Sequence, residues 1–405
     1  MVGNLETLQG KEMNANASAG SSRVGTLSRR ATAWVLAILA ATLAACATEE
    51  ISRVPESRAL SPAEARALVA QHLPANISER NGWATDIYAA FSAMQIPVTP
   101  ENVCAVVAVT EQESSFRADP VVPGLSAIAW KEIDRQADRA SIPALAVRAA
   151  LLLPSPSGKS YSERLDTVRT EKQLSEIFED FIGMVPLGRT FFANHNPVRT
   201  GGPMQVSIAF AESHAAAKTY PYPVNGSIRH EVFTRRGGMY FGIAHLLDYP
   251  VSYDNHIYRF GDFNAGHYAG RNAGFQRAVT IASGIPLALD GDLLRYERGQ
   301  PAAEPGETET ALRVLAKRVD MTHAQIRRDL ELGRTFEFEK TRLYARVFAL
   351  ADKLNGKPLP RAALPQILLK SPKITRKLTT EWFANRVATR YRSCLRRGAD
   401  ATAMS

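Results

Sequence analysis

The sequence has few cysteines and lacks the short motifs that mark several common enzyme classes. Three cysteines occur in 405 residues, and no two of them form a C-x-x-C pair, so a zinc ribbon or a dithiol redox centre is not expected. Neither a G-x-S-x-G motif nor a phosphate-binding P-loop is present, which argues against a common serine hydrolase and a nucleotide hydrolase. Any chemistry that the chain performs must therefore use other groups.

Histidine is also scarce, and its eight copies form no recognisable set of metal ligands. His245, His256 and His267 recur at intervals of 11 residues, but no H-x-x-x-H pair occurs. The stretch R-H-E-V-F-T begins like a zinc-protease motif and lacks its second histidine. The sequence therefore predicts no metal site and no cofactor.

Apolar and helix-forming sequence is abundant. Hydrophobic residues make up 45% of the chain and charged residues 22%, which is enough to bury a large core and argues against disorder. Apolar residues at helical spacing cover most of the chain, whereas strands look few and no internal repeat is visible. We therefore expect a mainly α protein. The net charge of +9 favours anionic partners but says nothing about the fold.

A single long apolar run lies near the N-terminus and resembles a bacterial lipoprotein signal peptide. Arg29 and Arg30 precede the run A-T-A-W-V-L-A-I-L-A-A-T-L-A-A-C, which is too short to span a bilayer stably. Its last four letters, which end at Cys46, are similar to a lipobox. The resemblance implies cleavage before Cys46, acylation of that cysteine and a lipid anchor in the membrane. Because Ala47 follows, and not the aspartate of inner-membrane retention, we expect the periplasmic face of the outer membrane.

Acylation would leave Cys104 and Cys394 as the remaining cysteines, 290 positions apart (394 − 104 = 290). In an oxidising compartment the two could form a disulfide, which would tie the C-terminal end to the helix predicted around Cys104. Two buried free thiols fit the sequence equally well. The sequence leaves both interpretations open.

Helix signals and changes in composition divide the chain. Ser61 before Pro62, and Thr99 before Pro100, predict helix starts, with a third helix at about 82–94 between them. A stretch rich in Pro, Gly and Glu at 298–309 predicts a linker. The resulting organisation is a signal peptide at 1–45, a tether at 46–60, a lysozyme-like domain at 61–297 with a helical insertion at about 126–200, and a helical basic region at 310–400.

Three further segments carry local predictions. Paired glycines within 200–203 predict a turn or short hairpin before another helix. The segment G-G-M-Y-F-G-I-A-H-L-L-D-Y-P at 237–250 has the pattern of an amphipathic helix. The segment F-N-A-G-H-Y-A-G-R-N-A-G-F at 263–275 is typical of a Gly- and Asn-rich loop beside a helix.

Basic residues accumulate toward the C-terminus. Residues 357–397 hold 11 lysines and arginines, against Glu381 as the single acidic residue. Interleaved aromatic residues superficially suit nucleic acid, but an exported lipoprotein rarely meets any, so we expect no nucleic-acid partner. Anionic lipid headgroups or the acidic groups of the cell wall are better candidates. A solvated helix face is the simplest interpretation.

The candidate chemistry begins at V-A-V-T-E-Q-E-S-S-F-R, where an apolar helix ends in two glutamates. Glu111 and Glu113 are two positions apart and therefore lie on different sides of the helix. A carboxyl group held against an apolar wall has a raised pKa, which suits a general acid near neutral pH. The spacing alone does not tell which of the two is half-buried.

Three short motifs in a fixed order give this region a family resemblance. Glu-Ser-Ser-Phe at 113–116 resembles the E-S-x-F signature of lytic transglycosylases and goose-type lysozymes. Gly-Pro-Met-Gln at 202–205 is similar to their G-L-M-Q motif, and Phe-Asn-Ala-Gly at 263–266 looks like their Y-N-A-G. The resemblance covers about residues 98–285, and it also extends to an uncharacterised family of proteobacterial lipoproteins with lysozyme-like features.

The resemblance implies a lysozyme-like α domain that cleaves the glycan strands of peptidoglycan. Glu113 would protonate the glycosidic oxygen between N-acetylmuramic acid and N-acetylglucosamine and then act as base. The sugar's own 6-hydroxyl would attack and give a 1,6-anhydro product, so one carboxylate would suffice where most glycosidases need two. The motifs carry the further substrate-binding candidates Ser114, Gly202, Met204, Gln205, Asn264, Ala265 and Gly266.

The motifs also depart from the family pattern. Gly202 lies 89 positions beyond Glu113 (202 − 113 = 89), which is longer than usual in this family and indicates the insertion. Pro203 replaces a leucine and removes a backbone donor, and Phe263 replaces a tyrosine. A wall-binding scaffold lipoprotein without catalysis and a hydrolytic muramidase therefore stay as alternatives. The second carboxylate of a muramidase would come from Asp119, Asp248, Asp254 or Asp262.

Overall fold

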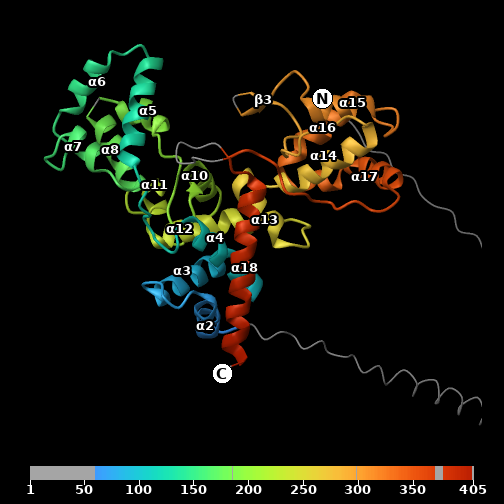
Figure 1. The fold of residues 1–405 in the computed structure, drawn as a ribbon, viewed down its shortest axis with the longest axis horizontal. Coiled ribbons are helices and arrows are strands. Elements are labelled where there is room, and N and C mark those ends of the chain that lie inside the picture. The colour runs from blue at the N-terminus through green and yellow to red at the C-terminus, as the bar shows by residue number, and fades with distance from the viewer. Residues whose placement is uncertain (1–59, 185, 298, 370–376, 404–405) are drawn as a thin grey trace, which may run out of the picture. The chain divides into compact units, whose positions relative to one another are not determined.

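The computed structural model describes residues 60–184, 186–297, 299–369 and 377–403, and these form a mainly α protein, as the sequence predicts (Figure 1). They belong to one compact unit that begins at Leu60. The predicted signal peptide, the tether and Cys46 lie outside the described residues. No helix in the described ranges combines the length and the apolarity needed to cross a membrane. The buried apolar side chains form three clusters, called here the first core, the insertion core and the second core.

The first core is built by helices from both ends of the described chain, together with a two-stranded antiparallel hairpin. Its elements are α2 (Pro62–His72), α3 (Arg80–Ala93), α4 (Pro100–Glu113), β1 (Thr200–Gly201), β2 (Val206–Ser207), α10 (Ile208–Ala217), α11 (Ile228–Val232), α12 (Arg235–Leu247), α13 (His256–Ala265) and α18 (Thr380–Ala403). The hairpin and the helix after it confirm the prediction made from the paired glycines.

Both predicted helix starts are confirmed. The hydroxyl of Ser61 accepts a hydrogen bond from the backbone N–H of Glu64 at 3.3 Å, and the Glu64 carboxylate accepts one from the Ser61 N–H at 2.8 Å. Thr99 caps α4 by accepting from the backbone N–H of Asn102 at 3.2 Å. These bonds satisfy backbone groups that a helix start leaves without partners. The third helix, α3, buries Trp83 in the first core.

The prediction of an amphipathic helix at 237–250 is right about the helix and wrong about its exposed face. From Gly237 to Leu247, every residue of α12 except His245 is buried. The cause is tertiary packing, because α3, α4, α10, α11 and α13 all contact this helix. The glycines at 237, 238 and 242 leave room for other segments of the protein to approach the helix closely. A helix surrounded by other elements has no solvent side to present.

A small helical subdomain follows α4 and precedes the hairpin, and the helices predicted between 126 and 192 are present. Its core is formed by α5, α6, α7 and α8, with Tyr161 fully buried in it. α6 exposes Leu145, whose side chain is 82% accessible. The elements are α5 (Leu125–Arg139), α6 (Ala144–Leu151), α7 (Tyr161–Thr167), α8 (Glu171–Gly183), α9 (Gly188–Phe192) and the 3-10 turn η1 (Ala193–His195).

The second core lies on both sides of the expected linker. α14 comes before the linker and packs closely against α17, which comes after it. The described linker residues hold strand β4 and the start of α15, so a division between 297 and 310 would cut this core. The elements are α14 (Ala269–Ser283), β3 (Tyr296–Glu297), β4 (Gln300–Pro301), α15 (Glu307–Val314), α16 (His323–Glu331), η2 (Leu332–Arg334), η3 (Phe336–Lys340) and α17 (Arg342–Asn355).

α18 returns the chain to the first core, where it lies along α4 and α13 (Figure 1). A disulfide joins Cys104 of α4 to Cys394 of α18, with a Cα–Cα distance of 5.5 Å. Of the two interpretations that the sequence left open, the structure has the disulfide. It closes a loop between residues 290 positions apart.

The basic C-terminal helix is amphipathic. Phe383, Val387 and Cys394 are buried in the first core, whereas Arg386 and Arg392 are exposed. The interpretation of the basic residues as a solvated helix face therefore holds for the exposed side of α18. Its other side is part of the core.

Candidate functional site

The first motif lies where α4 ends. Glu113 is the last residue of the helix and is half-buried. Ser114 follows as the C-cap, and its hydroxyl donates to the carbonyl oxygen of Thr110 at 3.2 Å and accepts from the backbone N–H of Arg117 at 3.3 Å. These bonds satisfy groups at the helix end. Ser114, which the sequence assigned to substrate, is thus engaged by the backbone beside Glu113.

The chain leaves α4 through an unusual backbone. Ser115 and Phe116 have φ angles of 50° and 59°, in the left-handed region that residues other than glycine rarely adopt. Phe116 is 4% exposed, and its ring meets that of Trp83 edge to face at a centroid distance of 5.3 Å. Packing of this ring holds the sharp turn after Glu113. Strained backbone that packing maintains is often found at functional sites.

The two glutamates have different surroundings, which the spacing could not reveal. Glu111 faces α18, where its carboxylate lies 3.7 Å from the guanidinium of Arg397. Arg397 also donates to the backbone carbonyl of His72. Glu111 therefore belongs to the contact between α4 and α18, and Glu113, at the helix end beside the strained turn, is the better candidate for chemistry.

The second motif forms the turn of the β1–β2 hairpin. Gly202 has a φ of 73°, and a Cβ there would collide with the carbonyl oxygen of Val232, so only glycine fits. The backbone N–H of Gln205, whose own φ is 50°, donates to the carbonyl oxygen of Gly202 at 3.1 Å. Met204 is fully buried. Met204 therefore shapes the turn from inside, and the half-buried Gln205 is the residue of this motif with a polar side chain near the surface.

α12 brings the first two motifs onto one support. A Cβ added to Gly242 would lie 2.5 Å from the Sδ of Met204, and one on Gly238 would collide with the ring of Pro203. Met239 lies between these glycines, and its Sδ accepts a hydrogen bond from the hydroxyl of Thr110 at 3.8 Å. The last turn of α4 and the hairpin turn thus rest on the same stretch of α12. Pro203 packs against Gly238 of α12.

The third motif is helical, and the prediction of a loop over 263–275 is wrong for most of its length. Phe263, Asn264 and Ala265 end α13, Gly266 stops it with a φ of 107°, and α14 begins at Ala269. Asn264 is exposed, and its side-chain oxygen accepts from the hydroxyl of Thr380 at 3.3 Å. Local Gly and Asn content predicted a loop, but the packing of both helices overrides it.

A group of histidine and aromatic rings borders the third motif. The rings of His245 and His267 stack at 4.6 Å, and Phe210 and Phe263 approach His245 at 4.6 Å and 5.1 Å. Burial, and secondarily His267, lowers the pKa of His245 to about 4, so the ring is neutral at physiological pH. The described residues contain no group of three or more His, Cys, Asp or Glu side chains arranged to hold a metal ion. The sequence analysis considered His245 and His267 for their spacing, as metal ligands, and set that interpretation aside.

Asp262 has a structural role next to the third motif. Its carboxylate is fully buried and accepts hydrogen bonds from the hydroxyls of Tyr249 and Tyr253 and the backbone N–H groups of Tyr268 and Gly270, at 2.6 to 3.1 Å. Burial raises the pKa of Asp262 to about 6, against the effect of these donors. The carboxylate holds the α13–α14 corner and has no capacity left for a sugar or a water.

The other candidate carboxylates are also engaged or exposed. Asp248 lies 3.2 Å from the Nε2 of His214 and 2.5 Å from the Nζ of Lys218. Asp254 is exposed. Burial raises the pKa of Asp119, which contacts the start of α8 in the insertion at Thr170.

Comparison with known proteins gives a family and a relative. The family described as "Protein of unknown function (DUF1615)" matches residues 76–397. The chain is 54% identical over 375 residues, which cover 93% of this chain and 100% of the relative, to the "Uncharacterized protein YaiW" of Escherichia coli strain K12. No solved structure matches the chain. The family match includes all three motifs and runs through both the insertion and the second core.

Proposed function

The chain belongs to the DUF1615 family, and from the site that its three motifs border we propose that it is a lytic transglycosylase with a lysozyme-like fold. In this proposal it cleaves the β-1,4 bond between N-acetylmuramic acid and N-acetylglucosamine and leaves a 1,6-anhydro product. Cys46 carries the lipid anchor, and the protein acts on peptidoglycan from the periplasmic face of the outer membrane.

One observation carries the proposal. The end of α4, the hairpin turn and the end of α13, far apart in the sequence, all contact α12, through Met239, Gly242 and His245 respectively. Two of these three segments contain residues with strained backbone. These are Ser115 and Phe116 after α4, and Gln205 in the hairpin turn. Such a gathering of segments far apart in the sequence around one helix supports a common site for the three motifs.

The proposed mechanism uses Glu113 twice. The protonated carboxyl group donates its proton to the glycosidic oxygen, and the bond from the muramic acid C1 to that oxygen breaks. The carboxylate then takes the proton of the 6-hydroxyl as the oxygen forms its bond to C1. No water is consumed, and Glu113 returns to the protonated state.

The surroundings of two of the four other acids favour this mechanism over hydrolysis. A hydrolytic enzyme with two carboxylates needs the second one free to act on water or on the sugar. Asp262 is saturated with donors and Asp248 is held by His214 and Lys218. An attacking group supplied by the substrate removes the need for a second acid.

The remaining motif residues divide into two groups in this proposal. Gln205 and Asn264 offer side-chain amides that can donate to and accept from sugar hydroxyl and acetamido groups. Met204 and Gly202 fix the hairpin turn, and Gly266 ends α13. Ser114 and Ala265 hold the helix ends on which Glu113 and Asn264 lie.

The test is digestion of peptidoglycan sacculi by the purified protein, with soluble products analysed by mass spectrometry. We expect 1,6-anhydro-muropeptides from the wild type. Glu113→Gln keeps the shape of the side chain and removes the acid, so the rate should fall by about 10²–10⁴-fold. Glu111→Gln is the matched control, since it changes a carboxyl group two positions away on the same helix end, and it should retain most of the activity.

The other outcomes lead to different functions. Products heavier by one water would replace the proposal with a hydrolytic muramidase. Intact sacculi that nevertheless bind the wild-type protein would replace it with a wall-binding scaffold. Equal rates for Glu113→Gln and the wild type would remove Glu113 from the chemistry.

A further inference from the structure

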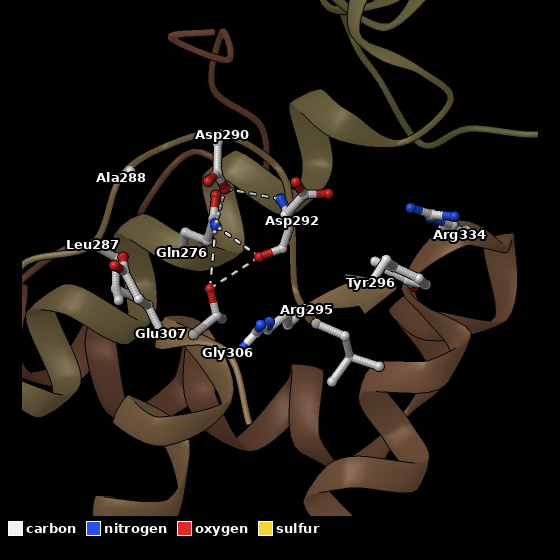
Figure 2. Close-up of a pocket in the computed structure, with 12 residues that line it drawn as sticks. Gln276, Leu287, Ala288, Asp290, Asp292, Arg295, Tyr296, Gly306, Glu307 and Arg334 are labelled. Atoms are coloured by element: carbon white, nitrogen blue, oxygen red, sulfur yellow. Dashed lines mark hydrogen bonds between the residues drawn. The ribbon is translucent and has the colours of Figure 1, made fainter. Parts of the chain in front are cut away.

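The second core carries a cavity of about 400 Å³ that none of the three motifs reaches. It lies between α14, the loop after it, the start of α15 and the end of η2 (Figure 2). Its walls bring together the acidic side chains of Asp290, Asp292 and Glu307 and the basic side chains of Arg295 and Arg334. Cavities of this size hold small molecules or the end of a peptide.

The acidic wall is held in place from beneath by Gln276, which is 2% exposed. The Nε2 of Gln276 donates to the Oδ1 of Asp290 at 2.6 Å and to the carbonyl oxygen of Asp292 at 3.1 Å, and its Oε1 accepts from the N–H of Gly291 at 2.8 Å. The hydroxyl of Thr308 also donates to the Asp292 carbonyl, at 3.1 Å. The dashed lines of Figure 2 mark the bonds that join Gln276 and Thr308 to Asp290 and Asp292. A loop fixed in this way presents its carboxylates without reorganisation.

Asp292 lines the cavity and is exposed to solvent. Within the described ranges, no hydrogen bond or ion pair reaches its carboxylate; partial burial and the neighbouring Asp290 raise its pKa, and the charge of Arg334 lowers it. Two carboxylates on one wall repel each other unless a cation binds between them. The acidic wall is therefore suited to an ammonium group.

Arg334 and Tyr296, which also line the cavity, supply a cation and a flat surface. The guanidinium of Arg334 stacks over the ring of Tyr296 at 3.5 Å, and it forms no ion pair with any described residue. Arg334 is near enough to Asp292 to lower the pKa of that carboxyl, yet the two do not pair. Arg295, in contrast, is engaged with Glu297 and Glu304 at 2.9 and 3.2 Å. A stacked guanidinium with free N–H groups is suited to a carboxylate.

We propose that this cavity binds a ligand that carries both an ammonium and a carboxylate group, such as an amino acid or a short peptide. Asp292 receives the ammonium, Arg334 receives the carboxylate, and Tyr296 lies beside the part between them. An acid and a base thus line one cavity without forming an ion pair with each other. This proposal does not depend on the function proposed for Glu113.

The test is calorimetric titration of the full chain, purified in detergent, with three probes. Alanyl-alanine carries both charges, N-acetyl-alanyl-alanine lacks the ammonium, and alanyl-alanine amide lacks the carboxylate. We expect the first to bind and each of the others to bind at least about tenfold more weakly, since each loses one charge-assisted contact. Equal binding of all three probes, or no binding of the first up to about 10 mM, would overturn the proposal.

Two variants assign the charges to their residues. Asp292→Asn should weaken alanyl-alanine and its amide and leave the acetylated probe unchanged, whereas Arg334→Gln should weaken alanyl-alanine and the acetylated probe and leave the amide unchanged. Asp320→Asn is the matched control, because its carboxylate is exposed and lies outside the cavity. Glu113→Gln should bind all three probes as the wild type does. If Asp320→Asn weakens binding as much as Asp292→Asn, the cavity is not the site.

Discussion

The first and the second core hold together helices that are distant in the sequence, but they do so with different chemistry. In the first core a disulfide links α4 to α18, and the buried ionisable side chains Glu231 and Asp262 belong to other helices, α11 and α13. In the second core no disulfide is present among the described residues, and two ionisable side chains lie almost fully buried. These are Arg271, which is 1% exposed, and Glu309, which is 0% exposed.

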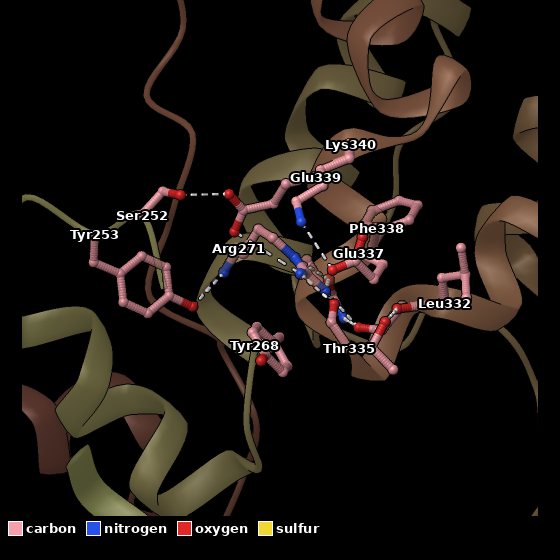
Figure 3. A network of polar contacts seen from close by, with 12 residues as sticks. Ser252, Tyr253, Tyr268, Arg271, Leu332, Thr335, Glu337, Phe338, Glu339 and Lys340 are labelled. Carbon is pink, nitrogen blue, oxygen red and sulfur yellow. Dashed lines mark hydrogen bonds and ion pairs between the residues drawn. The ribbon is translucent and has the colours of Figure 1, made fainter. Parts of the chain in front are cut away.

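Arg271 is the centre of a polar network (Figure 3). Its guanidinium donates to the carbonyl oxygens of Gly333 at 2.6 Å and Thr335 at 2.8 Å and to the Oδ1 of Asn272 at 2.9 Å. Its backbone N–H donates to the hydroxyl of Tyr253 at 3.0 Å, across the α13–α14 corner. One side chain thus joins α14 to the chain around η2 and η3 and fixes the corner that leads to the first core.

Glu309 joins α15 to α16 in a similar way, through its buried carboxylate. It lies 2.7 Å from Arg313 on its own helix and 2.8 Å from Arg327 of α16. The comparison shows two ways to close a helical core, one by a covalent link that depends on an oxidising compartment and one by buried, directional hydrogen bonds. The two cores can therefore be weakened separately.

The largest effect is expected from Arg271→Met. Methionine fills similar space but leaves the carbonyl oxygen of Thr335 without its donor and that of Gly333 with only the Asn272 amide, which should lower the free energy of unfolding by about 2–4 kcal/mol. Urea unfolding measures the loss, and hydrogen exchange should find it in α14 to α17. Arg135→Met is the control, because Arg135 pairs with Glu132 at the surface and such pairs contribute about 1 kcal/mol or less. Similar losses in both variants would contradict a special role for the buried arginine.

Removal of the disulfide should have the next largest effect, and in the other core. The double variant Cys104→Ala, Cys394→Ala frees a long loop in the unfolded chain, which should cost about 2–4 kcal/mol. Hydrogen exchange should rise in α4 and α18 and stay unchanged in α14 to α17. Reductant should destabilise the wild type by a similar amount and leave the double variant unaffected. An equal rise in hydrogen exchange in both cores would mean that the two cores do not unfold independently.

The sequence predicted those features that short stretches determine. The capped starts at Ser61 and Thr99, the hairpin at the paired glycines and the helices of the insertion all depend on residues within a few positions of one another. The motif at 113–116 and the end of the helix at Glu113 were also predicted from such a short stretch. Local hydrogen bonds and backbone preferences carry this information, so the prediction did not need the tertiary structure.

The rest depends on partners far away in the chain. The burial of α12 on all sides could not be inferred from its own pattern, because the pattern does not say how many elements surround a helix. The pairing of Glu111 with Arg397 and the choice of disulfide over free thiols both require α18 to lie on α4. The cavity beside Asp292 unites α14, α15 and η2, which the sequence assigned to two different domains.

A smaller effect concerns Asp262, at the corner between the cores. Its pKa is about 6 when folded and about 3.9 when unfolded, so the folded state holds an extra proton between these values. Wild-type stability from this group is therefore greatest below pH 4 and is lost as the pH rises through 6. Relative to Asp262→Asn, which does not titrate, the wild type should lose about 1–3 kcal/mol between pH 4 and pH 7.

The comparison between these two proteins isolates Asp262 from His245. The lowered pKa of His245, about 4, acts in the opposite direction, because its contribution is present above its unfolded pKa and is lost as the pH falls through 4. Both proteins contain His245, so its effect cancels in the difference. Urea unfolding of both proteins at a series of pH values measures this. If the wild type gained stability relative to Asp262→Asn as the pH rises, the result would contradict the assignment.

The smallest effect on stability, with a larger one on activity, is expected from Gly242→Ala. The added Cβ meets the Sδ and Cβ of Met204 at 2.5 and 2.6 Å, so the hairpin turn must move away from α12, at a cost of about 1–2 kcal/mol. Gly261→Ala is the matched control, because its Cβ would meet Leu364 and Pro365 at an ordinary 3.4 Å. If Gln205 acts beside Glu113, displacement of its turn should slow sacculus digestion severalfold more than the stability loss explains. A Gly242→Ala protein with wild-type digestion would separate the hairpin turn from the chemistry and leave α12 with a role in packing only.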